Sequence, residues 1–290
     1  MRHTAIDSRD YIVAFTLYSA DDCPPDFELN SDVRLDAGLF LPRDDPDWFG
    51  RSNYPPRVLL LSGDELTVVA HPSTREPAWR CPLRRLVLFE SGHMLLKGWF
   101  RFVGNEAEKS LPYNTRGYRA VSRFMCRFRQ AWLACGEPPT QTVPPTLPKE
   151  LDLKFDNALH LELDARETVQ AHFYEAPRET RYRRWLLPRQ TRTAGELLAL
   201  TEKRLVWITD RCGDSSARYG TVTASVRRDG TTGAAVVCGD AGPTLEIRLA
   251  HGSLWKFAVR ADRQADAETF ALALQNPKTR NATRGAQPRI

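Results

Sequence analysis

The pattern of hydrophobic and polar positions contains one segment twice. Residues 58–69 align without gaps with residues 197–208, further along the chain. Each copy is an apolar run that ends in Ser62 or Thr201, then a short polar turn, then a Leu that opens a second β-prone run. Two short apolar runs separated by turn residues are typical of a β-hairpin. The duplication predicts two domains of one kind in tandem.

Further short apolar runs predict more strands in each half. Turn and loop residues separate them, as between the strands of an antiparallel sheet. Residues 10–56 match no pattern, apart from a candidate strand at residues 11–18. The remaining predicted strands are Val58–Leu61, Leu66–Val69, Leu86–Phe89 and Leu95–Val103 in the first half, then Thr168–Tyr174, Glu196–Leu200, Leu205–Thr209, Arg218–Val226, Ala234–Val237, Leu245–Leu249 and Leu254–Val259 in the second.

Each half closes with a predicted amphipathic helix. The first spans residues 115–134, with Thr115 as the N-cap candidate and Gly136 as the stop. The last helix starts near Ala265. Apolar residues recur at spacings of three and four along both helices, which is the spacing of a buried stripe. The stripes are Tyr118, Val121, Phe124, Met125, Phe128, Trp132 and Leu133 in the first helix, and Ala267, Phe270, Ala271 and Leu274 in the last.

Proline places the boundary between the two halves. Residues 136–148 contain five prolines, which are excluded from helix interiors and central strands and give a stiff connector. The predicted organisation is an N-terminal domain over 1–136 and a linker over 137–149. A C-terminal domain over 150–276 follows, and then a polar, disordered tail over 277–290.

Composition predicts a cytoplasmic protein, with peripheral attachment to a membrane as an alternative. The chain has 290 residues, of which 42% are hydrophobic, and no apolar run is long enough for a transmembrane helix. The N-terminus lacks the pattern of a signal peptide. Six cysteines are scattered without a Cys-x-x-Cys motif, so we expect reduced, mostly buried thiols.

Leu197–Asp210 resembles the opening hairpin of bacterial PH-like domains, which are akin to the GRAM and pleckstrin-homology superfold. Arg218–Val222 fits the next strand of that family. In the first half, Met94–Phe100 and Pro112–Thr115 are similar to the family's last strand and helix entry. The resemblance covers about 58–134 and 168–275, whereas residues 10–56 match nothing in the family.

The resemblance implies a mainly β fold with C-terminal helices: two tandem PH-like, partly open barrels, each closed by one amphipathic helix. It implies no catalytic residues and no cofactor, because such domains mostly dock lipid head groups, peptides or partner domains. The fold alone does not select among these ligands.

Arginine dominates the positive charge of the chain. The formal net charge is +5, and of the 41 Lys and Arg residues seven are lysines, so 34 are arginines. Arginine binds carboxylate and phosphate in a bidentate manner, although a GC-rich genome gives the same excess. The densest cluster lies in residues 178–192, at the predicted barrel rim. Its candidate binding residues are Arg181, Tyr182, Arg183, Arg184, Trp185, Arg189 and Arg192.

This basic and aromatic segment has several interpretations. It suits an acidic protein surface or an anionic membrane, where arginines contact phosphates and Trp185 enters the interface. It also suits nucleic acid, with Tyr182 or Trp185 stacking on a base. The remaining interpretation assigns the segment no binding role. In that case Trp185 belongs to a buried strand, and the arginines are solvated or paired with nearby acids.

A second candidate surface lies on the first predicted helix. Arg116, Arg119, Arg123 and Arg127 recur at spacings of three and four and form a basic ridge. Like charges at these spacings repel, and an acidic neighbour relieves the repulsion. The favoured neighbour is the acidic stretch after the linker, and a separate partner is the alternative. That stretch contains Asp152, Asp156, Glu162, Asp164 and Glu167.

No catalytic signature is present in the sequence. His-Glu-x-x-His, Gly-x-Ser-x-Gly and phosphate-binding glycine loops are absent. His160 and His172 are placed on predicted strands, and His93 in a hairpin turn. A deep pocket that gathered His160, His172 or a cysteine with a carboxylate would favour an enzyme or an accessory subunit of one.

The sequence therefore predicts a non-catalytic binding or scaffold protein. The expected ligand is an acidic protein partner, docked through the basic and aromatic rim of the second domain. Peripheral binding of anionic lipid head groups is the alternative. An accessory subunit of an enzyme complex and a nucleic-acid binder are further alternatives.

Overall fold

The computed structural model describes residues 11–27, 29, 34–43, 54–94, 97–105, 107–136, 151–164, 167–184, 187–210, 220–240 and 242–275. The side chains of residues 94 and 179–192 lie outside this description, as do the predicted linker and tail. The fold is mainly β with C-terminal helices, as the sequence predicted. The contacts divide the chain into two compact units: unit 1 is Met1–Glu137 with Ser216–Val222, and unit 2 is Pro138–Ser215 with Thr223–Ile290.

Unit 1 begins with an antiparallel sheet whose strands follow one another in chain order. The strands are β1 (Phe15–Leu17), β2 (Ala37–Leu41), β3 (Arg57–Ser62), β4 (Glu65–Ala70) and β5 (Trp79–Pro82). Residues 10–56, which the sequence pattern left largely unassigned, thus supply two strands at one side of this sheet. In β4 the burial alternates with period two, which is the pattern of a strand with one buried face.

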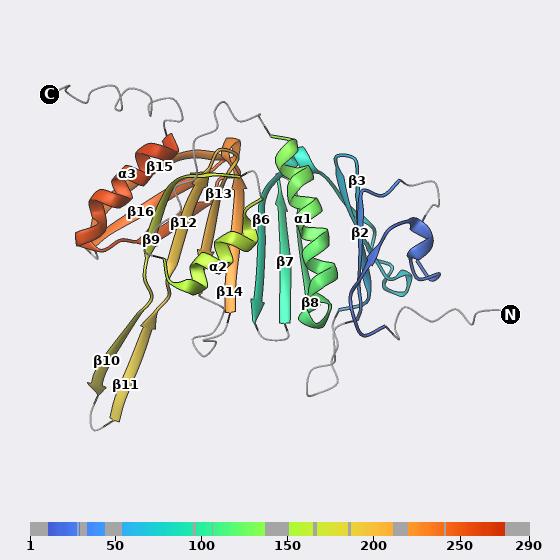
Figure 1. Cartoon of the computed structure of the whole chain (residues 1–290), viewed down its shortest axis with the longest axis horizontal. Coiled ribbons are helices and arrows are strands. Elements are labelled where there is room, and N and C mark those ends of the chain that lie inside the picture. The colour runs from blue at the N-terminus through green and yellow to red at the C-terminus, as the bar shows by residue number, and fades with distance from the viewer. Residues whose placement is uncertain are drawn as a thin grey trace. The chain divides into compact units, whose positions relative to one another are not determined.

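A meander and a helix complete unit 1. The meander consists of β6 (Leu86–Met94), β7 (Lys97–Gly104) and β8 (Glu108–Asn114), and the helix α1 (Tyr118–Ala134) follows. Figure 1 shows α1 between this meander and strands β2 and β3. Phe124, Phe128 and Trp132 of α1 are buried in one core with residues of both sheets. The Trp132 indole Nε1 donates to the Leu86 carbonyl oxygen at 2.9 Å, which anchors the helix on β6.

Unit 2 begins with a helix that the sequence pattern did not predict, α2 (Leu153–Glu162). Asp152 caps it by accepting from the Lys154 N–H, and Phe155, Ala158 and Leu159 form its buried stripe. The strands β9 (Val169–Glu175), β12 (Glu196–Thr201), β13 (Arg204–Thr209) and β14 (Gly220–Arg227) then lie side by side in that order. The division between the units falls within β14, after Val222.

A second meander and a helix end unit 2. The meander consists of β15 (Thr231–Gly239), β16 (Gly242–Leu249) and β17 (Leu254–Ala258). The closing helix α3 (Gln264–Gln275) packs against β15 and β16, as Figure 1 shows. It buries Ala267, Phe270, Ala271 and Leu274, the stripe that the sequence predicted.

The duplicated segment forms the same hairpin twice, with the same register. Leu61 pairs with Leu66 between β3 and β4, and the aligned Leu200 pairs with Leu205 between β12 and β13. The correspondence extends to the next strand. Ala37 of β2 pairs with Leu61, and Ala171 of β9 pairs with Leu200. Strand β2 is therefore the counterpart of β9, although no sequence signal linked them.

The short 3-10 turns repeat as well. One precedes each meander, at Leu83–Arg85 and at Arg228–Gly230. Another precedes each terminal helix, at Thr115–Gly117 and Ala261–Arg263. Each unit thus contains four neighbouring strands, a three-stranded meander and a terminal helix. Unit 1 adds β1, and unit 2 adds α2 and a hairpin between β9 and β12.

Several local predictions were wrong. Thr115 is not the cap of α1, because it lies in the preceding 3-10 turn and the N-cap position of α1 is Gly117. Tyr118 belongs to no buried stripe, since its side chain is 43% exposed. His160 lies on helix α2 rather than on a strand, and His93 lies within β6 rather than in a turn.

Candidate functional site

The leading predicted surface, residues 178–192, forms two paired strands. β10 (Arg178–Arg184) pairs with β11 (Leu187–Thr193) over its full length. Arg178 pairs with Thr193 here, and Glu175 pairs with Glu196 between β9 and β12, so the register continues unchanged from one pair to the next. Figure 1 shows this hairpin continuing beyond the ends of β9 and β12. The segment is thus an extension of one long antiparallel ribbon.

The structure describes the backbone of this hairpin but not the side chains that the prediction named. Arg181, Tyr182, Arg183, Arg184, Arg189 and Arg192 lie on its two strands. Tyr182 pairs in register with Arg189, and Arg181 with Gln190. Trp185 lies outside the described residues. The assignment of a binding role to this segment therefore stays a prediction.

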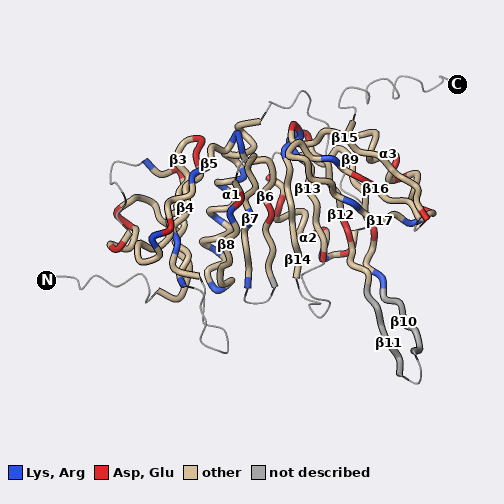
Figure 2. Tube along the Cα trace, turned by 180° about the vertical axis from the view of Figure 1, so that it is seen from behind, with Lys and Arg blue, Asp and Glu red and all other residues tan. Residues whose placement is uncertain are grey.

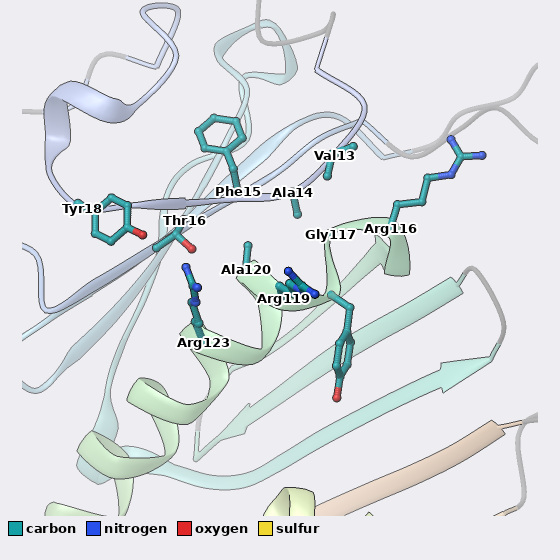
Figure 3. A pocket seen from close by; sticks show the side chains of 11 residues that line it. Val13, Ala14, Phe15, Thr16, Tyr18, Arg116, Gly117, Arg119, Ala120 and Arg123 are labelled. Carbon is teal, nitrogen blue, oxygen red and sulfur yellow. The ribbon is translucent and has the colours of Figure 1, made fainter.

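The second predicted surface, on α1, lies along an open groove. The groove has a volume of about 670 Å³ and lies wholly within unit 1. One wall is formed by Val13–Thr16 and Tyr18, and the other by Arg116–Ala120 and Arg123. Figure 3 shows Arg123 extending toward Thr16 across the groove. The sequence predicted the helix wall, whereas the opposite wall comes from the segment that it left unassigned.

The packing of α1 explains why its arginines line the groove. Val121, Phe124 and Met125 are buried, so the positions between them face outward. Arg119, Arg123 and Arg127 are accordingly exposed. Within the described part of the chain, these three guanidinium groups have no hydrogen bond and no ion pair, so their positive charges are not compensated there.

Close backbone packing holds one end of the groove in place. A Cβ atom on Gly117 would lie 2.5 Å from the Ala14 Cβ and 2.8 Å from the Ala14 backbone nitrogen. Only glycine therefore fits where the chain before α1 meets the start of β1. Asn114 accepts a hydrogen bond from the Arg116 N–H at 2.9 Å, which caps the turn that leads into the helix.

The groove is electrostatically positive and partly apolar. α1 carries no acidic residue in its first turn, where the helix dipole favours negative charge. In Figure 2 the blue Lys and Arg positions recur along α1. Val13 and Tyr18 are 41% and 75% exposed. This arrangement suits a ligand that brings carboxylates together with apolar side chains.

The acidic stretch after the linker, which was favoured as the neighbour of the basic ridge, makes contacts inside unit 2. Glu167 pairs with Arg204, Asp156 lies 3.4 Å from His160, and Asp152 caps α2. Glu162 accepts from the Thr223 hydroxyl at 3.2 Å. These carboxylates are occupied by partners in their own unit.

Arg204 and Glu167 form a fully buried ion pair. Arg204 Nε and Nη2 donate to the two Glu167 carboxylate oxygens at 2.8 and 2.7 Å, and both side chains are 0% exposed. Burial by itself raises the pKa of Glu167, but the Arg204 charge and the hydrogen bonds from Arg204 and Thr201 bring the pKa below its ordinary value. The pair holds the hairpin to the start of β9.

One cluster has the composition of a nucleophilic site. His71 Nδ1 lies 2.7 Å from the Ser73 hydroxyl, and His71 Nε2 lies 2.9 Å from an Asp26 carboxylate oxygen. The Ser73 N–H also donates to Nδ1, while the Thr74 and Arg75 N–H groups donate to carbonyls of the same turn. These three backbone donors are therefore already used and do not form an oxyanion hole. We interpret this cluster as a cap that ties Asp26 to the turn.

The other chemistry predicted from the sequence does not converge. His160 and His172 are exposed on α2 and β9, and neither lines the groove of unit 1. Among the described residues, no cluster of His, Cys, Asp and Glu is placed to hold a metal ion. The expectation of mostly buried thiols was wrong in part, because Cys126 and Cys238 are exposed. Burial raises the pKa of Cys23 to about 12, with help from the Asp26 charge.

None of the helices in the described part of the chain has the length and apolar composition needed to cross a bilayer. A comparison with protein-family models finds no match for this chain, and a comparison with curated proteins finds none either.

Proposed function

We propose that this protein is a non-catalytic docking protein that binds an acidic segment of a partner protein in the groove of unit 1. The observation that carries the proposal is the row of arginines beside the groove whose guanidinium groups have no partner among the described residues. Arg119 and Arg123 line it directly, and Arg127 continues the row along α1. A carboxylate that accepts a bidentate hydrogen bond from such a guanidinium relieves the repulsion along the helix.

The repeated architecture supports the proposed relation to PH-like domains. Four strands, a meander and a terminal helix occur in both units, in the same order. Under this proposal the protein carries two related modules. The groove, however, is built partly from β1, which has no counterpart in the described part of unit 2 and lies outside the residues that carry the resemblance.

The shape of the site favours a protein ligand over a membrane surface. The arginines line a recess beside Val13 and Tyr18, and a flat bilayer surface reaches such a recess less readily than a single extended chain does. The net charge of +5 is modest for strong adhesion to anionic lipid. Nucleic acid would need a longer row of phosphate contacts and would lose affinity steeply with added salt.

The hairpin β10–β11 is a second proposed contact. Residues 178–192 concentrate six arginines on an extension of the β9–β12 ribbon. A two-stranded ribbon gains stability from a surface that covers it. We assign it an auxiliary role beside the groove, and the same experiment tests both surfaces.

The experiment is affinity purification of the tagged protein from its native host, at low and at moderate salt. The wild type is compared with R119E/R123E in the groove and with R183E/R184E in the hairpin. The matched control is R80E/R248E, because Arg80 and Arg248 are exposed and their side chains make no hydrogen bond or ion pair in the described structure. All three double variants change the net charge equally.

We expect a stoichiometric protein partner that R119E/R123E loses and R80E/R248E retains. The expected loss of affinity exceeds about tenfold, because each hydrogen bond to a charged group contributes about 1.5–3 kcal/mol. Equal capture by all variants would refute the groove as the binding surface. If the wild type recovers no partner but sediments with vesicles of anionic lipid at low salt, the ligand is a membrane and the proposal is wrong.

A further inference from the structure

The strand beside the groove indicates how the ligand binds. We infer that the acidic segment binds in an extended conformation, as a strand added to the outer edge of β1, with alternate carboxylates on Arg119 and Arg123. This inference rests on the proposed function and specifies the form of the ligand. Three features carry it: the edge of the sheet, the direction of the side chains and the spacing of the arginines.

β1 is the outermost strand of its sheet. It pairs with β2 through Phe15 with Phe40, Thr16 with Leu39 and Leu17 with Gly38, and no other described strand pairs with it. An edge strand presents N–H and C=O groups on its outer side, which an extended peptide can satisfy. The groove follows this strand and its flanks, because Phe15 and Thr16 of β1 line it together with Val13 and Ala14 before the strand and Tyr18 after it.

The side chains of β1 alternate between two cores. Ala14 is buried in the core that contains α1, whereas Phe15 and Leu17 pack in the core on the opposite face of the sheet. Figure 3 shows Ala14 and Thr16 directed toward the helix and Phe15 directed away from it. A strand added beside β1 would alternate in the same way, so every second side chain would face α1.

The spacing of the arginines matches this alternation. Arg119 and Arg123 are four residues apart on a helix, which places them about 6 Å apart along its axis at about 1.5 Å per residue. Residues two apart on a strand are about 6.6 Å apart at about 3.3 Å per residue. Acidic residues at every second position of an extended segment that runs along α1 therefore match the spacing of the two guanidinium groups. The intervening side chains face away from α1.

The chain also contains an acidic segment of its own. Asp44, Asp45 and Asp47 lie outside the described residues, in the segment between β2 and β3. Its three carboxylates make this segment the alternative ligand for the groove. We favour an external ligand, and the variant D44N/D45N/D47N decides between the two.

The test uses a defined synthetic peptide, fluorescein-labelled Gly-Thr-Val-Glu-Val-Glu-Val-Thr-Gly, and fluorescence anisotropy with the full chain. Two further peptides have the same sequence with backbone N-methyl groups. In one peptide the two Glu residues are N-methylated, and in the other the flanking Val residues are. In a strand, the N–H groups of alternate residues point to the same side. One of the two methylated sets therefore faces β1, and the other faces solvent.

We expect one methylated peptide to bind at least about tenfold more weakly and the other to bind within about threefold of the parent, as strand addition requires. A peptide of the same composition with its Glu residues adjacent should also bind more weakly. Equal binding by both methylated peptides would overturn the inference. Tighter binding of the parent peptide by D44N/D45N/D47N would also overturn it, because the chain's own segment would then be the occupant.

The failure of this inference is distinguishable from failure of the proposed function. If both methylated peptides bind equally but R119E/R123E binds none of them, the groove is an acidic-ligand site without strand addition. If R119E/R123E binds the parent peptide as well as R80E/R248E does, the proposed function itself fails. Thermal unfolding of each variant tests whether the substitutions leave the fold intact.

Discussion

The hairpins β3–β4 and β12–β13 share a pattern and a register but place their polar residues differently. In unit 1 the turn is polar and open: Ser62 donates to the Arg34 carbonyl oxygen, and the Gly63 N–H donates to Asp36. In unit 2 the aligned turn lies between the buried residues Thr201 and Arg204, and Thr201 donates to Glu167 at 2.8 Å. Identical strand pairing therefore coexists with different environments at the two ends of the turn.

The clearest difference is at the residue that opens the second strand. Glu65 in unit 1 aligns with Arg204 in unit 2. Glu65 is partly exposed and accepts a hydrogen bond from the neighbouring Thr67, whereas Arg204 is 0% exposed and bound to Glu167. The repeat therefore specifies the backbone of the hairpin. Which of its polar residues is buried depends on the segment that packs against it.

The largest expected effect is the loss of the buried charge pair. R204A should destabilise unit 2 by about 3–5 kcal/mol, because it leaves Glu167 buried without its partner. The aligned substitution E65A should cost less than about 0.5 kcal/mol, as for other surface residues. Urea unfolding, with hydrogen exchange on β13 and β4 to separate the two units, measures both. Equal losses from the two substitutions would contradict the contrast between the copies.

A matched pair of core substitutions tests the likeness of the two hairpins. Leu61 and Leu200 are aligned and are 1% and 0% exposed. L61A and L200A should each cost about 2–5 kcal/mol, through lost burial and the cavity left behind. The same unfolding experiment measures them. A loss confined to one unit would show that the shared register does not give an equivalent core.

Acid should weaken the hairpin of unit 2 through Glu167. The pKa of this carboxyl group in the folded protein lies below its ordinary value of 4.5, so its contribution to stability is complete above that value. The contribution is lost as the pH falls through the lowered pKa. Urea unfolding followed from neutral to acid pH should show this loss, and E167Q should show less of it. An identical acid dependence in E167Q would exclude Glu167 as the responsible group.

The smallest expected effect concerns the turn of the first hairpin. Gly63 has φ of 58°, and a Cβ atom at this position would have no neighbouring atom within 4 Å, so only the backbone conformation opposes a side chain. G63A should therefore cost about 1 kcal/mol. The neighbouring D64A should cost less than about 0.5 kcal/mol. Thermal unfolding compares the two, and an unaffected G63A would show that the turn relaxes into another conformation.

The elements with strong local signals were predictable. The apolar runs of β3, β4, β12 and β13 and the stripes of α1 and α3 could be recognised because their periodicity is complete within each element. β8 was missed because it contains Lys109 and Pro112, which an outer strand tolerates. α2 carried a readable signal in its Asp152 cap and the spacing of Phe155, Ala158 and Leu159, which the sequence interpretation overlooked.

The candidate groove was predictable only on one side. The spacing of Arg119 and Arg123 on α1 follows from helix periodicity alone. The opposite wall at Val13–Tyr18 carried no signal that linked it to the helix, because contact between segments so far apart in the chain depends on the closure of the whole unit. The close approach of Gly117 to Ala14 became visible only in the folded chain.

The amino-acid pattern alone specifies the two hairpins, their shared pairing and the terminal helices, because strand pairing across a short turn and a helical stripe depend on residues close together in the chain. The folded chain adds the burial of Arg204 with Glu167, 37 positions away, and the meeting of β1 with α1. A buried charge and a groove both need partners from distant segments. Their placement is therefore a property of long-range packing, which no local pattern contains.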